Sequence, residues 1–287
     1  MLIQWFPGHM AKTKRLITEH LKAVDVTAEL LDARIPSSSA NPMIDELTAG
    51  KPRFVILNKA DLADPEKTAA WEAWYRDRGF PVLAMDSRSN KGKKKLLSLA
   101  RQMAAPVLAK WKKRGLRARP VRMMILGIPN VGKSTLINRL SGTAATRTAN
   151  TPGHTRGKQW VRLADGLDLL DTPGVLWPKF EDQTAAMRLA ATGAIAGDVF
   201  DAETVVPALM ETLAKEAPAR LKETYAIDDV DQDSQLLLEA AARRRGCILP
   251  GGKIDWERAE QVILNDFRSG KLGRITLDAV PEGEKKS

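Results

Sequence analysis

One segment, GIPNVGKST at residues 127–135, constrains the fold more than any other feature of the sequence. It follows the apolar run RMMIL and precedes a helical pattern, so it matches the phosphate-binding motif G-x-x-x-x-G-K-[ST] in the context that the motif requires. Its glycines let backbone N–H groups surround phosphate oxygens, and the following helix directs its positive end at the anion. We therefore expect an α/β fold with a nucleotide at this loop. The residues expected to bind it are Asn130, Val131, Gly132, Lys133, Ser134 and Thr135.

Two side chains of this loop have predicted chemical roles. Lys133 supplies a point charge to the β- and γ-phosphates, so we predict that it is a catalytic residue. The Ser134 hydroxyl is a predicted ligand of Mg²⁺.

Apolar runs alternate with helical patterns over the first 180 residues, which predicts a mainly parallel sheet with helices on both faces. After Lys179 the strand signals end and only helical patterns follow, so we expect two domains, residues 1–180 and a small all-α domain at 181–287 with a short disordered tail. The predicted strands are Val24–Leu31, Arg53–Leu57, Pro81–Met85, Arg122–Leu126, Gln159–Leu163 and Leu167–Leu170. The predicted helices are 10–22, 65–78, 93–105, 133–141, 183–196, 202–216, 234–245 and 255–269, with 106–120 as a helix extension or linker.

The segment NKAD, Asn58 to Asp61, follows the apolar strand FVIL and so lies at the carboxyl edge of the sheet, where ligands bind in such folds. Asp61 can accept hydrogen bonds from guanine N1–H and the 2-amino group, whereas adenine would leave this carboxylate desolvated and unpaired. Lys59 can lie along the base plane, and Asn58 can join this loop to the phosphate loop. With Ala60, these residues predict GTP and GDP as ligands.

Two further loops are expected at the nucleotide. DTPG follows the strand LDLL, and its Asp171 is expected to hold Mg²⁺ through water, while the Gly174 N–H faces the γ-phosphate. Upstream, the segment NTPGHT ends at Thr155, the predicted switch threonine for Mg²⁺ coordination and catalysis, with Thr151 as the alternative.

The last predicted base contact lies after the strand PVLAM, where the loop at Asp86 and Ser87 offers a backbone N–H to guanine O6. In most GTPases the motif at this place is Ser-Ala, and here it is Asp-Ser.

The order of these motifs departs from that of ordinary GTPases, in which the phosphate loop precedes DxxG and NKxD follows both. Here NKAD (58–61) comes first, GIPNVGKS (127–134) second and DTPG (171–174) third. The loops can still converge, because the position of each strand in the sheet matters and chain order does not. Thus we predict a circularly permuted P-loop GTPase domain.

These motifs, together with WFPGHMAK and DARIPxSSxNP at residues 32–42, resemble the ribosome biogenesis GTPase A family, the YlqF-type permuted GTPases. The resemblance covers nearly the whole chain. It implies a cytoplasmic GTP hydrolase that acts late in assembly of the large (50S) ribosomal subunit, contacts 23S ribosomal RNA and is stimulated by that subunit. We expect a monomer that binds RNA or the ribosome through the helical domain at 181–287, in a GTP-dependent manner, and that is released on hydrolysis.

The residue that positions the attacking water is not supplied by DTPG. Many GTPases have a Gln just after DxxG, but Val175 stands there and cannot orient water. His9 in PGHMAK is the predicted catalytic replacement, because the permutation brings the N-terminus near this switch and the family resemblance also points to it. A structural His that caps the helix beginning near Met10 is the alternative.

Asn130 resembles the asparagine of GTPases that recruit K⁺ near the β- and γ-phosphates, where a cation does the work of an arginine finger. The alternative is an Asn that only shapes the loop. Arg34 in DARIP faces either the nucleotide or RNA, and the sequence does not decide between them.

Charge also favours a polyanionic partner. The net charge is +10, and the 78 residues from Ser87 to Ala164 hold 19 Lys or Arg and no Asp or Glu, more than one nucleotide needs. A solvated basic helix face is the alternative. No apolar run reaches the roughly 18 residues of a membrane span, and a single cysteine excludes an internal disulfide.

Three other functions stay open at this point. A metabolic phosphotransferase uses the same phosphate loop, but NKAD argues against ATP. A pure RNA-binding module with a vestigial site conflicts with the intact Lys133, Ser134, Asp171 and Asp61. A GTP-dependent RNA-binding switch with another target, such as tRNA modification, fits the same motifs.

Overall fold

The computed structural model describes residues 10–115, 119–142, 159–163, 166–172, 174, 176, 182–197 and 199–281, without the side chains of 10–13, 159 and 171. Within these ranges the chain forms a six-stranded sheet of order β3-β2-β1-β4-β6-β5, in which only β5 is antiparallel to its neighbour. The strands are β1 (Val26–Asp32), β2 (Arg53–Asn58), β3 (Val82–Ala84), β4 (Val121–Gly127), β5 (Gln159–Leu163) and β6 (Leu167–Asp171).

Helices cover both faces of the sheet. Successive strand residues point to opposite faces, and because they are apolar on both faces, each face needs a cover. In β4, Met123 and Ile125 pack on the face that holds α4 (Lys93–Lys113) and α5 (Lys133–Ser141). Met124 and Leu126 pack on the opposite face, against α1 (Met10–Leu21) and α2 (Pro42–Leu47). The helix α3 (Pro65–Asp77) covers β1 and β2 on the α1 side through Trp71 and Tyr75.

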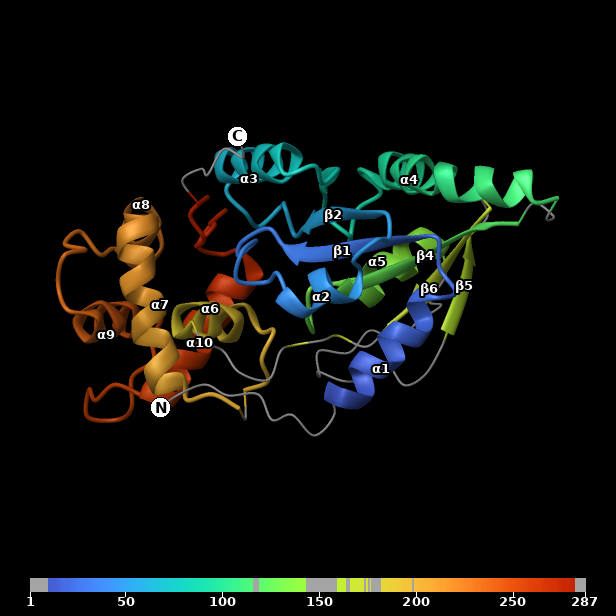
Figure 1. Cartoon of the computed structure of the whole chain (residues 1–287). Coiled ribbons are helices and arrows are strands. Elements are labelled where there is room, and N and C mark those ends of the chain that lie inside the picture. The colour runs from blue at the N-terminus through green and yellow to red at the C-terminus, as the bar shows by residue number, and fades with distance from the viewer. Residues whose placement is uncertain are drawn as a thin grey trace.

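Five helices follow β6 within the described residues. Figure 1 shows these helices grouped at one end of the sheet, the end toward which β1 runs, while α4 extends past the opposite end. The largest cluster of buried apolar side chains includes members from the sheet and from these helices, so the packing is continuous between them. The five helices are α6 (Gln183–Thr192), α7 (Ala202–Glu216), α8 (Pro218–Tyr225), α9 (Ser234–Arg244) and α10 (Trp256–Ser269).

After α10 the chain returns to the sheet. The Ile275 N–H donates to the Leu62 carbonyl at 3.0 Å, and the Leu277 N–H donates to the Arg34 carbonyl at 2.8 Å. Asp278 accepts hydrogen bonds from the N–H and hydroxyl of Ser38 at 2.7 and 2.8 Å. The C-terminal segment is therefore bonded to the loops that follow β1 and β2.

Three helix predictions were incomplete. The sequence pattern did not predict α2 and α8, and α4 continues to Lys113, through the first part of the segment 106–120 that was expected to be a helix extension or a linker. Pro106 lies inside α4, on an exposed part of the helix, so its missing N–H interrupts no buried contact. The predicted disordered tail falls mainly on 282–287, outside the described residues.

Candidate nucleotide site

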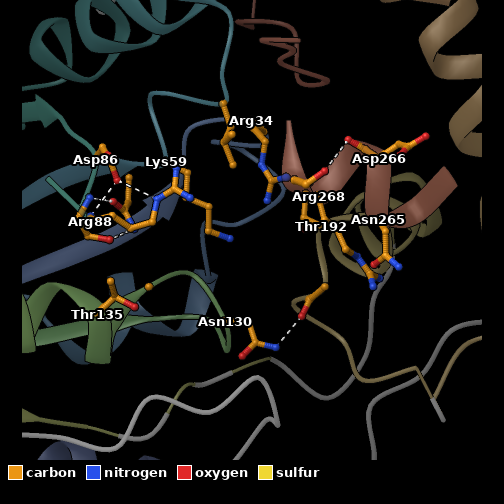
Figure 2. Close-up of a pocket in the computed structure, with 16 residues that line it drawn as sticks. Arg34, Lys59, Asp86, Arg88, Asn130, Thr135, Thr192, Asn265, Asp266 and Arg268 are labelled. Atoms are coloured by element: carbon orange, nitrogen blue, oxygen red, sulfur yellow. Dashed lines mark hydrogen bonds and ion pairs between the residues drawn. The ribbon is translucent and has the colours of Figure 1, made fainter. Parts of the chain in front are cut away.

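Four loops meet at the carboxyl edge of the sheet. They follow β3, β2, β1 and β4, which are adjacent parallel strands, so their ends converge although the chain order is different. Between them and the C-terminal helices lies a cavity of about 670 Å³ (Figure 2). Residues at these strand ends, in the loops and in the first turn of α5 line it, including Arg34, Asn58, Lys59, Asp86, Ser87, Arg88, Asn130, Gly132 and Thr135. The opposite wall includes Thr192, Gly193, Asn265, Asp266, Arg268 and Ser269.

Asn58 joins three of these loops. Its Nδ2 donates to the Val131 carbonyl at 2.7 Å and to the Ser87 hydroxyl at 3.2 Å. Its Oδ1 accepts from the Ser87 N–H at 3.0 Å. Because Asn58 is fully buried, these bonds hold the loops after β2, β3 and β4 at fixed separations.

Lys59 has a left-handed backbone conformation (φ 59°) and lines the cavity. Its Nζ lies 2.9 Å from Oδ2 of Asp32. Burial on its own would raise the pKa of the Asp32 carboxyl, but Arg34 and Lys59 together lower it below the ordinary range. Asp32 is thus a permanent anion that positions both cations.

Asp61 has one carboxylate oxygen with a partner and one without. Oδ2 forms an ion pair with Arg88, and the buried Oδ1 has no hydrogen-bond partner among the described residues. A buried, unpaired acceptor is costly unless a ligand completes it. Asp61 lines a second cavity, of about 520 Å³, that shares Asp86 with the first and also includes Ala60.

The backbone of the phosphate loop requires glycine at position 132. Gly132 has φ 107°, and a Cβ there would lie 2.4 Å from Asn58 Nδ2. The Lys133 ammonium donates to the carbonyls of Gly127 at 3.1 Å and Ile128 at 2.7 Å, so it lies along the loop. Ser134 and Thr135 occupy the first turn of α5, which begins at Lys133 and directs its N-terminus at the loop.

Gly174 of DTPG lies directly against the phosphate loop. A Cβ at Gly174 would come within 2.7 Å of Pro129 Cα and 2.9 Å of Lys133 Nζ. Only glycine therefore allows this approach of the two loops. His9, Thr155 and the Asp171 side chain lie outside the described residues.

Asn130 connects the phosphate loop to the helical region. It has φ 55°, and its Nδ2 donates to the Gly193 carbonyl at 2.7 Å, where α6 ends. Figure 2 shows this bond at the lower edge of the cavity. The Oδ1 atom of the same amide is an oxygen of the kind that coordinates K⁺.

Sequence reasoning missed several residues of the site. Arg88, which pairs with Asp61, directly follows the predicted Ser87, but no motif marks it. The wall formed by α6 and α10 had no signal, because nothing in a single sequence links those helices to the loops. Among the described residues no group of three His, Cys, Asp or Glu could hold a metal ion, and no described helix is long and apolar enough to span a membrane.

Comparison with known proteins decides the family. Residues 122–231 match a family described as 50S ribosome-binding GTPase. A Priestia megaterium protein named Ribosome biogenesis GTPase A is 43% identical over 286 residues, which are 99% of this chain and 99% of that protein. The chain belongs to the ribosome biogenesis GTPase A family.

Two solved structures that are similar to this ribosome biogenesis GTPase A family member have the same fold. A GDP-bound structure of TM YlqF is 26% identical with a TM-score of 0.70 and covers 93% of this chain and 100% of its own. A GNP-bound YlqF from T. maritima is 27% identical with a TM-score of 0.65 and covers 93% and 97%. The family match begins at β4 and leaves β1 to β3, with the NKAD loop, before it. The fold is therefore a circularly permuted P-loop GTPase fold with a helical C-terminal region, as predicted.

Proposed function

We propose that this protein is a GTPase of the cytoplasm that acts late in assembly of the large (50S) ribosomal subunit. GTP favours its binding to 23S ribosomal RNA, and hydrolysis promotes its release. Full-length similarity to ribosome biogenesis GTPase A supports the ribosomal role. The observation that carries the nucleotide assignment is the bond between Asn58 and Val131, which joins a guanine-recognition motif to a phosphate loop.

Guanine can supply the missing hydrogen-bond donor to Oδ1 of Asp61. Its N1–H and 2-amino group are adjacent donors, and they suit the Asp61 carboxylate because one of them can bond the unpaired Oδ1. Lys59 contributes its alkyl chain along the base plane, and the Ser87 loop contributes a backbone donor for O6. ATP offers no such donor pair, so the buried carboxylate would stay unsatisfied.

The phosphate side of the site suits a triphosphate. Lys133 exchanges its carbonyl partners for β- and γ-phosphate oxygens when the nucleotide binds. Mg²⁺ is assigned to Ser134, Asp171 and Thr155, and it would neutralise charge that develops on the phosphates. The close approach of Gly174 to Lys133 supports a switch role for this glycine, whose N–H would bond the γ-phosphate of GTP.

His9 is the proposed water-positioning residue, because Val175 cannot fill that role. Its neutral imidazole accepts a hydrogen bond from the attacking water. His9→Ala should reduce subunit-stimulated turnover by about 100-fold or more while the affinity for GTP stays within twofold. Unchanged stimulated turnover in this variant would exclude the role.

RNA binding is assigned to a basic surface on α4. This 21-residue helix carries no acidic residue, and none of its residues after Ala104 is buried, so its last turns project from the sheet. Phosphate groups of RNA suit such a surface, because lysines neutralise them and release counterions. Exposed lysines on it are Lys94, Lys95, Lys110, Lys112 and Lys113.

A co-sedimentation experiment tests the ribosomal role. We expect the protein to sediment with purified large subunits in the presence of a non-hydrolysable GTP analogue, and to remain in the supernatant with GDP or with small subunits. Replacing Lys110, Lys112 and Lys113 by Ala should weaken this binding and reduce its salt dependence. Equal sedimentation with both subunits, whichever nucleotide is present, would contradict the proposal.

A further inference from the structure

Arg34 is a buried arginine with one unsatisfied nitrogen. Its side chain is 2% exposed, and Nε and Nη2 donate to the two oxygens of Asp32 at 3.0 and 2.8 Å. Nη1 is buried and has no hydrogen-bond partner among the residues that the structure describes. A buried guanidinium N–H without an acceptor is costly, so this atom indicates a partner that binds there.

The unsatisfied group belongs to a residue of the main cavity. Arg34 lines that cavity together with Lys59 and Asn130, and Figure 2 shows it at the centre of the upper wall. Arg268 lines it from α10 and donates to the carbonyls of Ala190 and Ala191, at 2.8 and 2.9 Å.

The cationic groups around Arg34 exceed the anions that face them. Arg34 and Lys59 share the single carboxylate of Asp32, and Arg268 adds a third charge. Asp266 also lines the cavity, but it is paired with Arg245 at 2.8 Å and contacts Lys271. This part of the cavity therefore suits an anionic ligand.

The strand order indicates which part of a nucleotide would lie beside Arg34. Loops after β3 and β2 carry the predicted base contacts, and the loop after β4 is the phosphate loop. Arg34 follows β1, which lies between β2 and β4 in the sheet. In a nucleotide, the ribose and α-phosphate likewise lie between the base and the terminal phosphates.

We propose that Arg34 is a nucleotide-binding residue whose Nη1 donates a hydrogen bond to the ribose or α-phosphate of the bound guanine nucleotide. This assignment rests on the proposed function and extends its site to the DARIP segment. Arg34 also touches the helical region, since its Cζ lies 5.3 Å from the centroid of the Phe267 ring and its carbonyl accepts from Leu277. The nucleotide and the C-terminal helices thus share one contact residue.

The test uses Arg34→Lys in the full chain, because Lys keeps a charge beside Asp32 but cannot reproduce the planar fork. Arg119→Lys is the matched control. Arg119 also bonds both oxygens of an aspartate, Asp25, at 2.7 Å each, and it does not line the cavity. Equilibrium binding of a fluorescent GDP is measured for wild type and both variants, with thermal unfolding as a check of the fold.

We expect Arg34→Lys to weaken GDP binding by about 10- to 100-fold, the range for a lost hydrogen bond to a charged group. Arg119→Lys should stay within twofold of wild type. The same loss should appear for GMP in competition with fluorescent GDP, because GMP retains the ribose and α-phosphate.

Three results would overturn the assignment: Arg34→Lys within twofold of wild type, an equal loss in Arg119→Lys, or a loss for GDP that is absent for GMP. If the wild-type protein fails to bind any guanine nucleotide, the proposed function itself fails. If it binds them and Arg34→Lys does not change the affinity, only the role of Arg34 is rejected.

Discussion

Asn58 and Val131 are 73 residues apart in the chain, and the side-chain amide of the first donates to the carbonyl of the second at 2.7 Å. Asn58 ends β2, and Val131 lies in the loop after β4, with β1 between the two strands. The bond therefore joins base recognition to phosphate binding across one intervening strand. It depends on the position of the strands in the sheet, which is why a permuted chain order preserves it.

Asp61→Asn should change the preferred base from guanine to xanthine. An Asn amide donates to the C2 carbonyl of xanthine, whereas it faces the 2-amino group of guanine with a donor of its own. We expect the affinity for GDP to fall by about 100-fold or more and xanthosine diphosphate to bind. Competition against a fluorescent nucleotide measures both, and retained preference for GDP would show that Asp61 does not read the base.

Gly132→Ala should damage the nucleotide site more than the fold. Its Cβ would lie 2.4 Å from Asn58 Nδ2, so the bond to Val131 must break or the loop must move. Gly142→Ala is the control, because Gly142 also has a positive φ, 74°, but open space around its Cβ position. The positive φ alone should cost each variant about 1 kcal/mol of stability.

Only Gly132→Ala should also lose nucleotide affinity, by about tenfold or more. Urea denaturation and GDP titration measure the two effects. Similar GDP affinities in the two alanine variants would mean that the contact between Gly132 and Asn58 does not matter for binding.

Glu29→Gln should increase stability above neutral pH. Burial raises the pKa of Glu29 to about 7 in the folded state, and Arg53 offsets this only in part. The folded protein therefore holds this proton more tightly than the unfolded chain, and stability is lost as the pH rises from about 4.5 to about 7. Gln cannot ionise, so the variant avoids this loss, on the order of 1–3 kcal/mol.

Urea denaturation at about pH 5 and about pH 8 measures the difference between wild type and Glu29→Gln, which should grow with pH. The exposed Glu19→Gln is the control and should show no such change. A difference that is constant between the two pH values would refute the raised pKa.

Potassium should accelerate GTP turnover relative to sodium at equal ionic strength. A cation at Asn130 would stabilise charge that develops between the β- and γ-phosphates. The donation from Asn130 Nδ2 to the Gly193 carbonyl fixes the orientation of this amide at the phosphate loop. Asn130→Ala should remove the difference between the two salts, and equal wild-type rates in KCl and NaCl would reject the cation.

Local signals in the sequence predicted much of the fold. The range of α5 was correct because a glycine precedes it and Gly142 ends it with a left-handed residue. The helix predicted at 183–196 ends earlier, at Thr192, because Gly193 has φ 82°. Two short helices were missed, although Asn41–Pro42 before α2 is a capping signal, since neither is long enough to show a helical period.

The candidate site was also predicted from the sequence only in part. The loops at 58–61 and 127–135 were predicted because each motif is contiguous in the chain. The ion pair of Asp61 with Arg88 and the wall contributed by Asn265 and Arg268 were not, because they depend on packing between segments far apart in sequence. The sequence left two interpretations of Arg34 open, and the proposal that it binds the nucleotide rests on its buried neighbours.

GTP turnover with purified ribosomal subunits tests whether the large subunit stimulates hydrolysis by this protein. The rate is measured in K⁺ buffer with the protein alone, with large subunits and with small subunits. We predict slow turnover by the protein alone and with small subunits, and clear acceleration by large subunits. Slow turnover that neither subunit changes would contradict a role for GTP hydrolysis on the large subunit.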